Sequence, residues 1–435
     1  MSGRTAYVNA RLVDPASGLD AAAAPAAGLL VDGEAIAAVD PRLFAGGTPA
    51  DATVVDCQGA VLAPGFVDMR VQLRDPGEEH KEDIVSASRA AAAGGVTSMV
   101  ALPNTDPAID DEAVVEFIAR RAREVRLVKV YCYAAVTRGC RGDEMCEMGL
   151  LREAGVLGFT DGVYALADAR TMQRALQYTR ILGAPLIQHP EEPSLAASGV
   201  MHGGELSTRL GLPGISRAAE VLMLDRDLTL VEMTGGRYHA AHVSTAMGIE
   251  SIRRAKARGL AVTCDTAPPY FALNELAVSH YRTFAKLSPP LRTEDDRHAV
   301  VAGLADGTID AIASDHAPQD QESKRQPFEV AEYGAVGLET LLPVTLELVH
   351  NGHLALIDAL ALLTARPAGL LGLGAGRLVA GAPADLVVFD PDAPGRIEPD
   401  NFRSKSKNSP FDGRLVQGRV LRTVVDGRPV YIAGD

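Results

Sequence analysis

Two histidines and two aspartates stand where they could bind a metal ion or move a proton. His189 and His242 each close an apolar run of strand character, in APLIQHP and RYHAAHVS. Asp161 and Asp315 close two other such runs, GVLGFTD and IDAIASDHAP. One buried histidine is more often a hydrogen-bonded core residue than a ligand, but two of them with two carboxylates favour a metal site. Neutral imidazole and carboxylate are the ligands that zinc or manganese takes in hydrolases.

The elements that must position these side chains alternate between strand and helix over residues 61–369. Eight apolar β-rich runs end in small or polar residues, and stretches of helical period lie between them. This count predicts an α/β fold, a TIM-like (β/α)8 barrel. Its chemistry lies at the carboxyl ends of the strands, so the polar residues there are expected to converge: Arg70, Gln72, Asn104, Asp161, His189, His242 and Asp315.

Both ends of the chain have a different pattern. Residues 1–60 and 370–435 contain short alternating strands separated by Asp-Gly, Asn, Gly and Pro turns. Two strand-rich ends of similar character could pair. We therefore expect a small discontinuous β-sandwich domain beside the barrel of residues 61–369.

Composition narrows the class of protein. Hydrophobic residues make up 47% and charged residues 23%, as in soluble globular proteins. The net charge is −14 and basic residues form no stripe, which argues against nucleic acid as a partner. No signal-peptide pattern or apolar run of about 18 residues is present, so a cytoplasmic protein without membrane contact is expected. Five cysteines without CxxC spacing predict reduced thiols.

A series of motifs runs in order through nearly the whole chain. They are PGFVDMRVQLRDPG, LPNTDP, GFTDG, QHPEEPSL, HAAHVSTAMGIESIRRAKARG, KLSPPLR, DGTIDAIASDHAP, VGLET, GAPADLVVFDP and KNSPFDGRLVQGRV. In this order they resemble the dihydroorotase branch of the metal-dependent amidohydrolases. So many ordered motifs make a chance match very improbable.

The resemblance implies a role for each matching residue. His189 and His242 match the histidines of the second metal position, and Asp161 matches the acidic segment that supplies the bridging carboxylate. Asp315 matches the catalytic acid/base. Substrate-binding positions are matched by Arg74, Asn104 and Ser288.

The chain departs from the family pattern at the first metal position. Where the pattern has His-x-His, this chain has Arg70 and Gln72. Arginine has no lone pair to donate and stays charged, so this position is expected to be vacated. Other departures surround the predicted site, because histidine or asparagine of the pattern is replaced at Pro269, Tyr270, Ser288 and Gln319.

Several of these residues admit a second interpretation. Arg70 could fill the vacated position as a fixed cation, or could mark a site released from catalysis. Arg74 could pair with Asp75 or Glu78 across a turn. Asn104 could be a turn former.

Three functions remain open. The first is a dihydroorotase-like cyclic amide hydrolase of pyrimidine biosynthesis, which interconverts carbamoyl-aspartate and dihydroorotate with one Zn²⁺ on Asp161, His189 and His242. The second is a catalytically inactive relative that assembles with aspartate carbamoyltransferase. The third is a hydantoinase- or allantoinase-like hydrolase. A small anionic cyclic amide is the expected ligand, and homo-oligomers are common among such enzymes.

Overall fold

The barrel is built from the predicted apolar runs. The structure is a computed structural model that describes residues 3–434. One parallel sheet has the order β10-β9-β8, and a second has the order β11-β14-β15-β16. Their bounds are β8 (Phe66–Val71), β9 (Val96–Ala101), β10 (Lys129–Cys132), β11 (Leu186–Gln188), β14 (Tyr238–Ala240), β15 (Val262–Thr266) and β16 (Ala311–Ile312).

Isolated bridges close the two sheets into a ring. Phe159 forms parallel bridges with Ala134 and Leu186, and Val71 pairs with His316. The predicted (β/α)8 barrel is confirmed, but the fourth strand, GVLGFTD, is reduced to bridge pairs at Phe159. Its two glycines weaken a strand interior, because they add backbone entropy and no packing.

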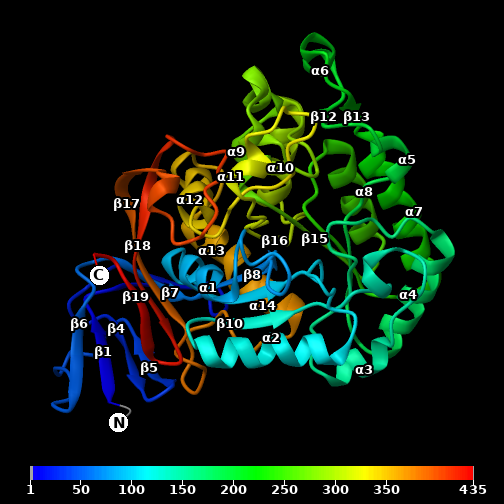
Figure 1. Cartoon of the computed structure of the whole chain (residues 1–435). Helices are drawn as coiled ribbons and strands as arrows, with labels where there is room; N and C mark the ends of the chain where they lie inside the picture. The colour runs from blue at the N-terminus through cyan, green and yellow to red at the C-terminus, as the bar shows by residue number, and fades with distance from the viewer. Residues whose placement is uncertain (1–2, 435) are drawn as a thin grey trace.

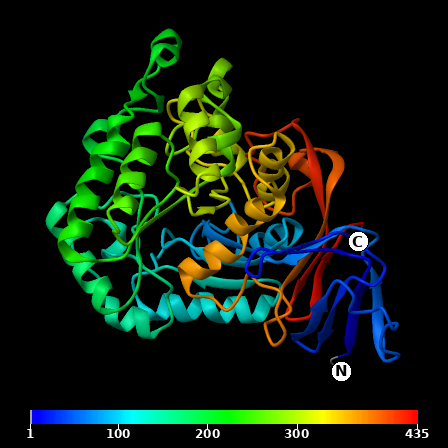
Figure 2. The same ribbon diagram turned by 180° about the vertical axis from the view of Figure 1, so that it is seen from behind.

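Helices surround the barrel (Figures 1 and 2). Side chains at the N-caps begin many of them, such as Asp83 before α1, Asp111 before α2 and Thr245 before α8. The longer helices are α1 (Ile84–Ala93), α2 (Glu112–Val125), α4 (Ala169–Ile181), α7 (Ala218–Thr234), α8 (Ala246–Ala257), α10 (Glu294–Ala305), α12 (Leu341–His350), α13 (Leu356–Leu363) and α14 (Ala365–Leu371).

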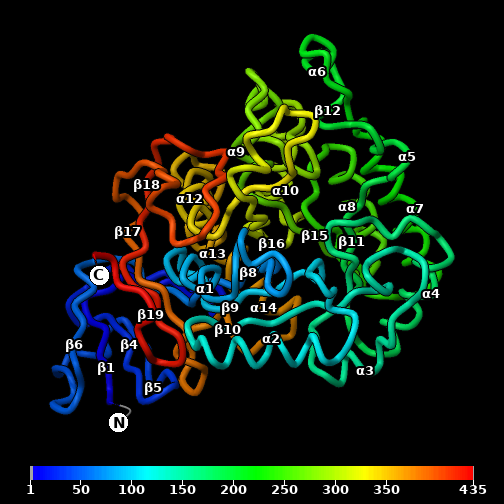
Figure 3. Tube along the Cα trace, in the orientation of Figure 1, coloured from blue at the N-terminus to red at the C-terminus, as the bar shows by residue number. Residues whose placement is uncertain are grey.

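Short elements complete the barrel. Figure 3 follows the chain through an arm that carries α6 (Glu205–Leu210) away from the barrel. The other short elements are α3 (Met148–Glu153), α5 (Pro193–Ala196), α9 (Pro268–Ala272), α11 (Gln321–Lys324), β12 (Met201–His202) and β13 (Gly214–Ile215), with 3-10 turns at η1 (Arg138–Cys140), η2 (Glu275–Tyr281), η3 (Thr283–Ala285) and η4 (Pro399–Asn401).

Strands from both chain ends form the smaller domain. A six-stranded sheet has the order β19-β18-β17-β7-β2-β3, and a four-stranded sheet has the order β5-β4-β1-β6. Apolar side chains of both sheets share one core, including Tyr7, Leu29, Leu62 and Val424. The strands are β1 (Arg4–Val8), β2 (Arg11–Asp14), β3 (Leu19–Ala21), β4 (Gly28–Asp32), β5 (Ala35–Asp40), β6 (Ala52–Asp56), β7 (Val61–Pro64), β17 (Leu386–Arg396), β18 (Leu415–Val425) and β19 (Arg428–Ile432).

The pairing of β7 bears on the boundary between the β-sandwich domain and the barrel. It pairs with β17 and β2 of the six-stranded sheet. We therefore propose that the barrel begins after Pro64 rather than at residue 61. Within the described residues, no helix is long and apolar enough to cross a membrane. All five cysteines are buried and free.

Candidate active site

One cavity of about 610 Å³ lies at the carboxyl ends of the barrel strands. Side chains from the ends of five strands reach it: β8, β9, β11, β14 and β16. All of the predicted site residues except Asp161 line it, namely Arg70, Gln72, Arg74, Asn104, His189, His242, Ser288 and Asp315.

The two histidines face one another inside this cavity. Nδ1 of His189 and Nε2 of His242 are 2.7 Å apart. The outer nitrogen of each ring faces a carboxylate, His189 toward Glu191 at 3.6 Å and His242 toward Asp315 at 3.2 Å. The 2.7 Å separation is that of a hydrogen bond, in which an N–H of one ring donates to the lone pair of the other.

His242 is a neutral ligand at physiological pH. Burial and the nearby Arg70 cation lower its pKa to about 4. Carboxylates behind the imidazoles are the usual outer partners of metal-binding histidines. Imidazoles with carboxylates beside them are donors of the type that a divalent cation takes.

A buried guanidinium lies at the predicted first metal position. Arg70 is 2% exposed, and its Nε donates to Oδ1 of Asp315 at 2.8 Å. Its Nη2 donates to the carbonyl of Gly162 at 3.3 Å. Although burial opposes ionisation, His242 and Arg70 hold the pKa of Asp315 well below its usual range. A guanidinium therefore supplies the positive charge beside this carboxylate.

The carboxylate of Asp161, a predicted metal ligand, is bound by other groups of the chain. Its carboxylate accepts hydrogen bonds from the backbone of Val136 and Thr137, each at 2.9 Å, and from the Thr137 hydroxyl at 2.6 Å. Within residues 3–434, no three His, Cys, Asp or Glu side chains are grouped as they would be around a metal ion. An ion at the second position would have two protein ligands here, His189 and His242.

The predicted substrate-binding residues also have protein partners. Arg74 donates to Glu78 at 2.6 Å and to the Pro318 carbonyl at 3.2 Å. The side-chain amide of Asn104 donates to the Asp161 carbonyl at 3.1 Å and accepts from Val163 at 3.0 Å. Both side chains still line the cavity. These contacts restrict the positions of both side chains in the cavity wall.

Two acidic residues that support the site were missed from the sequence. Glu191 lies beside the outer ring nitrogen of His189. The sequence signal for this residue was its place two residues after a histidine at a strand end. Glu220, on α7, accepts from the backbone of Ser244 and Thr245, at 3.1 and 3.0 Å, just after His242. His242 itself has a positive φ of 38°, which its backbone bond to Asp265 helps to hold.

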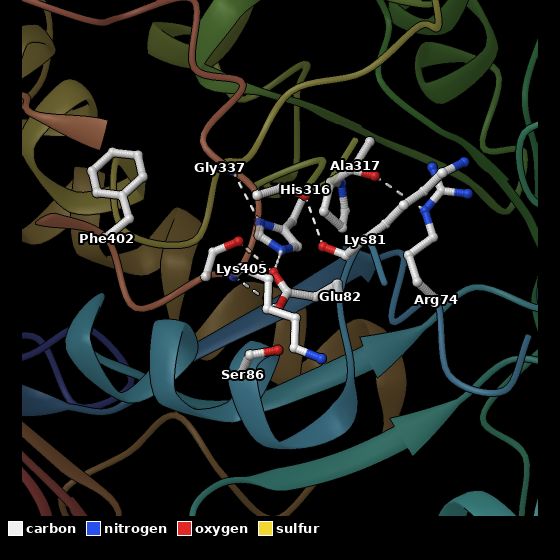
Figure 4. A network of polar contacts seen from close by, with 12 residues as sticks. Arg74, Lys81, Glu82, Ser86, His316, Ala317, Gly337, Phe402 and Lys405 are labelled. Atoms are coloured by element: carbon white, nitrogen blue, oxygen red, sulfur yellow. Dashed lines mark hydrogen bonds and ion pairs between the residues drawn. The ribbon is translucent and has the colours of Figure 1, made fainter. Parts of the chain in front are cut away.

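The C-terminal segment 402–411 is bound against the barrel beside the cavity. Figure 4 shows Glu82 facing His316, the residue after Asp315, with Lys405 close by. The Glu82 carboxylate contacts Nε2 of His316 at 3.4 Å and accepts from the Ser404 hydroxyl and the Lys405 backbone. Ser404 and Lys405, which precede the motif KNSPFDG, are therefore linked through Glu82 to the loop that carries Asp315.

The carboxylate of Glu339 also binds the segment 402–411. We expect it to make the free energy of unfolding depend on pH. Glu339 accepts from the backbone of Arg403 and Ser404, and burial raises its pKa from 4.5 to about 7. The folded chain thus keeps a proton that the unfolded chain releases near 4.5, so stability falls as pH rises through this window, by up to about 3 kcal/mol. Glu339→Gln should flatten this slope in urea unfolding between pH 5 and 7. Glu112→Gln, on the exposed start of α2, is the matched control, and an unchanged slope in Glu339→Gln would contradict the assignment.

Comparisons with known proteins agree with this architecture. A dihydro-orotase-like family model matches residues 59–247, and an amidohydrolase family model matches residues 231–431. Dihydroorotase from Anaplasma phagocytophilum (strain HZ) is 46% identical over 431 residues, 98% of this chain and 95% of that protein. Dihydroorotase from Wolbachia sp. subsp. Drosophila simulans (strain wRi) is 45% identical over 429 residues, 98% of this chain and 96% of that protein.

Solved structures share the same fold. L-hydantoinase from Arthrobacter aurescens superposes with a TM-score of 0.86 at 26% identity, over 100% of this chain and 97% of that one. Dihydropyrimidinase from Brevibacillus agri NCHU1002 superposes with a TM-score of 0.85 at 23% identity, over 98% of this chain and 94% of that one. A (β/α)8 barrel with a β-sandwich domain and histidines at its strand ends defines the class of metal-dependent amidohydrolases.

Within that class, the chain belongs to the dihydroorotase family of cyclic amidohydrolases. The predicted family, fold and enzyme class are confirmed. Membership of this metal-dependent family implies zinc.

Proposed function

We propose that this chain interconverts carbamoyl-aspartate and dihydroorotate in pyrimidine biosynthesis, with one zinc ion at the second metal position. The observation that carries the proposal is that His189 and His242 face one another in the cavity, each with a carboxylate beside its outer ring nitrogen. Family relatives at 44–46% identity over nearly the full chain support the choice of substrate.

The chain's own residues supply the remaining chemistry. A bound zinc ion would polarise the amide carbonyl and lower the pKa of water. Asp315 would take the proton from the attacking water and return it to the departing nitrogen. Because Arg70 keeps the pKa of Asp315 low, this carboxylate is a weak proton acceptor, and we expect turnover to be slow.

Relatives favour a ring that bears a carboxylate. Curated relatives at 44–46% identity are dihydroorotases, and Arg74 at the cavity wall matches the family position that holds the substrate carboxylate. Hydantoin and allantoin carry no carboxylate for this arginine to bind. The hydantoinase-like alternative therefore ranks below dihydroorotate, and its solved relatives argue for the fold alone.

Assays in both directions test this proposal. Wild-type chain with added zinc should open dihydroorotate and close carbamoyl-aspartate, whereas His242→Ala and Asp315→Asn should lose about 100-fold or more of that rate. Arg253→Met alters an exposed side chain on α8 and is the control for effects of expression and purification. Activity that is equal in Asp315→Asn and wild type would contradict the role of Asp315, and no activity in wild type would contradict the hydrolase.

A second function is favoured by one observation. Arg70 engages the carboxylate of Asp315, and residues 3–434 offer no group of three metal-binding side chains. A site in this state suits a non-catalytic assembly partner of aspartate carbamoyltransferase. Size-exclusion chromatography of this chain, alone and with that enzyme from the same cell, should then show a shared peak. Unshifted elution would contradict this function, and the lone chain's volume reports whether it forms the homo-oligomer that we expect.

A further inference from the structure

We propose that Lys324 is a positioning residue whose buried ammonium group joins two loops that form part of the wall of the active-site cavity. The first wall loop is residues 283–288, and it supplies Leu287 and Ser288 to the cavity. The second wall loop is residues 328–335, of which residues 332–335 line the cavity. The proposal rests on the function proposed above for the choice of substrate in its test.

The ammonium of Lys324 is bound by three backbone carbonyls. Lys324 is the last residue of α11 and is 2% exposed. Its Nζ donates to the carbonyls of Thr283 at 3.0 Å and Lys286 at 3.4 Å, both in the first wall loop. It also donates to the Glu332 carbonyl at 2.6 Å, in the second wall loop. An ammonium has three hydrogens to donate, so these contacts use all of them and connect the two loops.

A second buried ammonium, that of Lys286, supports the same connection from the first wall loop. Its Nζ donates to the Glu329 carbonyl at 2.9 Å and lies 4.5 Å from the centre of the Tyr333 ring. A cation over an aromatic face is attracted by the ring. The backbone N–H of Gly334 donates to the Lys286 carbonyl at 3.0 Å. The two wall loops are therefore held together at several points by two lysines.

Burying two ammonium groups beside each other opposes folding. Burial, together with the Lys286 cation, lowers the pKa of Lys324 from 10.5 to about 7. An apolar side chain of similar length would fill the same space without this cost. What the ammonium adds is a set of hydrogen bonds that fixes the separation of the two wall loops. We therefore assign its role to the shape of the cavity rather than to the stability of the fold.

The wall loops bear on the ligand and not on the reacting groups. Ser288 lies two residues after Lys286, and Tyr333 directly follows Glu332. Both side chains line the cavity, whereas Asp315 and the histidine pair belong to the ends of barrel strands. Loss of the ammonium should consequently weaken the binding of substrate more than it slows the chemical step.

Steady-state kinetics of dihydroorotate ring opening, on the full chain with added zinc, test the proposal. Lys324→Met should raise KM about tenfold and leave kcat within about threefold of wild type, the pattern of a lost binding interaction. Lys256→Met is the matched control. It removes an ammonium that donates to Thr308 and Asp310, which lie outside the cavity lining. This control should lower stability and leave KM unchanged.

Hydrogen exchange reads the wall loops without turnover. In Lys324→Met the backbone amides of Lys286 and Gly334 should exchange about tenfold or more faster, while those of α8 keep the wild-type rate. Thermal unfolding verifies that the variant is folded, and Lys324→Gln, which keeps two donor hydrogens, takes its place in both measurements if it is not.

A raised KM with faster exchange in the wall loops supports the proposal. An unchanged KM, a kcat that falls as much as kcat/KM, or unchanged exchange in a folded variant would overturn it. Inactive wild-type protein would contradict the function proposed above, and the exchange rates alone would then decide the role of Lys324.

Discussion

Replacing Arg70 and Gln72 together with histidine is expected to raise the bound divalent metal by about one ion per chain. Residues two apart at the end of a strand point to the same side, so both imidazoles would enter the cavity beside Asp315. Removing the guanidinium also frees the Asp315 carboxylate, which now accepts from Arg70 at 2.8 Å. Imidazole and carboxylate together form a zinc ligand set.

Elemental analysis after purification without chelator measures this gain. Arg70→His and Gln72→His alone should each gain less than the double variant, because each adds one imidazole ligand rather than two. Ring opening of dihydroorotate should rise with the metal content. An unchanged metal content in a folded double variant would show that the vacated position is closed to metal for a reason other than its side chains.

Substituting Glu220 by alanine is expected to cost about 3–5 kcal/mol of folding stability. Glu220 is 2% exposed and accepts from the backbones and hydroxyls of Ser244 and Thr245. Arg292, also buried, lies 4.0 Å away. Alanine would leave these donors and this cation without an acceptor, which is the costly way to break a buried network.

Urea unfolding measures this loss of stability, and two further variants serve as comparisons. Glu220→Gln keeps one acceptor oxygen and should lose less than alanine does. Glu232→Ala, at an exposed position of the same helix, should change stability by no more than about 0.5 kcal/mol. Since Ser244 and Thr245 lie two and three residues after His242, Glu220→Ala should also weaken zinc retention. A loss below about 1 kcal/mol would contradict the role of Glu220.

Much of the fold could be predicted from the period of apolar residues. Seven of the eight predicted barrel runs form strands of two to six residues with helices between them, and both ends of the chain meet in one six-stranded sheet. The fourth barrel strand could not be predicted at its true length. Its pattern matches a strand, but Phe159 alone forms bridges, because only tertiary contacts decide how far two backbones pair.

The candidate site was predictable in position and less so in its contacts. Residues at strand ends converge because the topology brings those ends together, so His189, His242 and Asp315 line one cavity. The partner of each side chain depends on the loops, as Asp161 shows. The Thr137 hydroxyl and two backbone amides donate hydrogen bonds to its carboxylate. Nothing in the motif GFTDG indicates these partners.

Arg70 illustrates the same limit. The sequence indicated that the metal ligand was lost, and it left two interpretations of the replacement. The ion pair with Asp315 and the contact with Gly162 favour the fixed cation. Asn104, by contrast, has both of its side-chain groups bonded to the chain, as a turn-forming residue would.

The central claim is a single metal position formed by His189 and His242 beside a resident arginine. Elemental analysis of wild-type protein purified without chelator, with His189→Ala and His242→Ala in parallel, tests it most directly. The account predicts about one zinc ion per wild-type chain and a loss of that ion in both variants. Wild-type chain without metal, or with two ions, would contradict it.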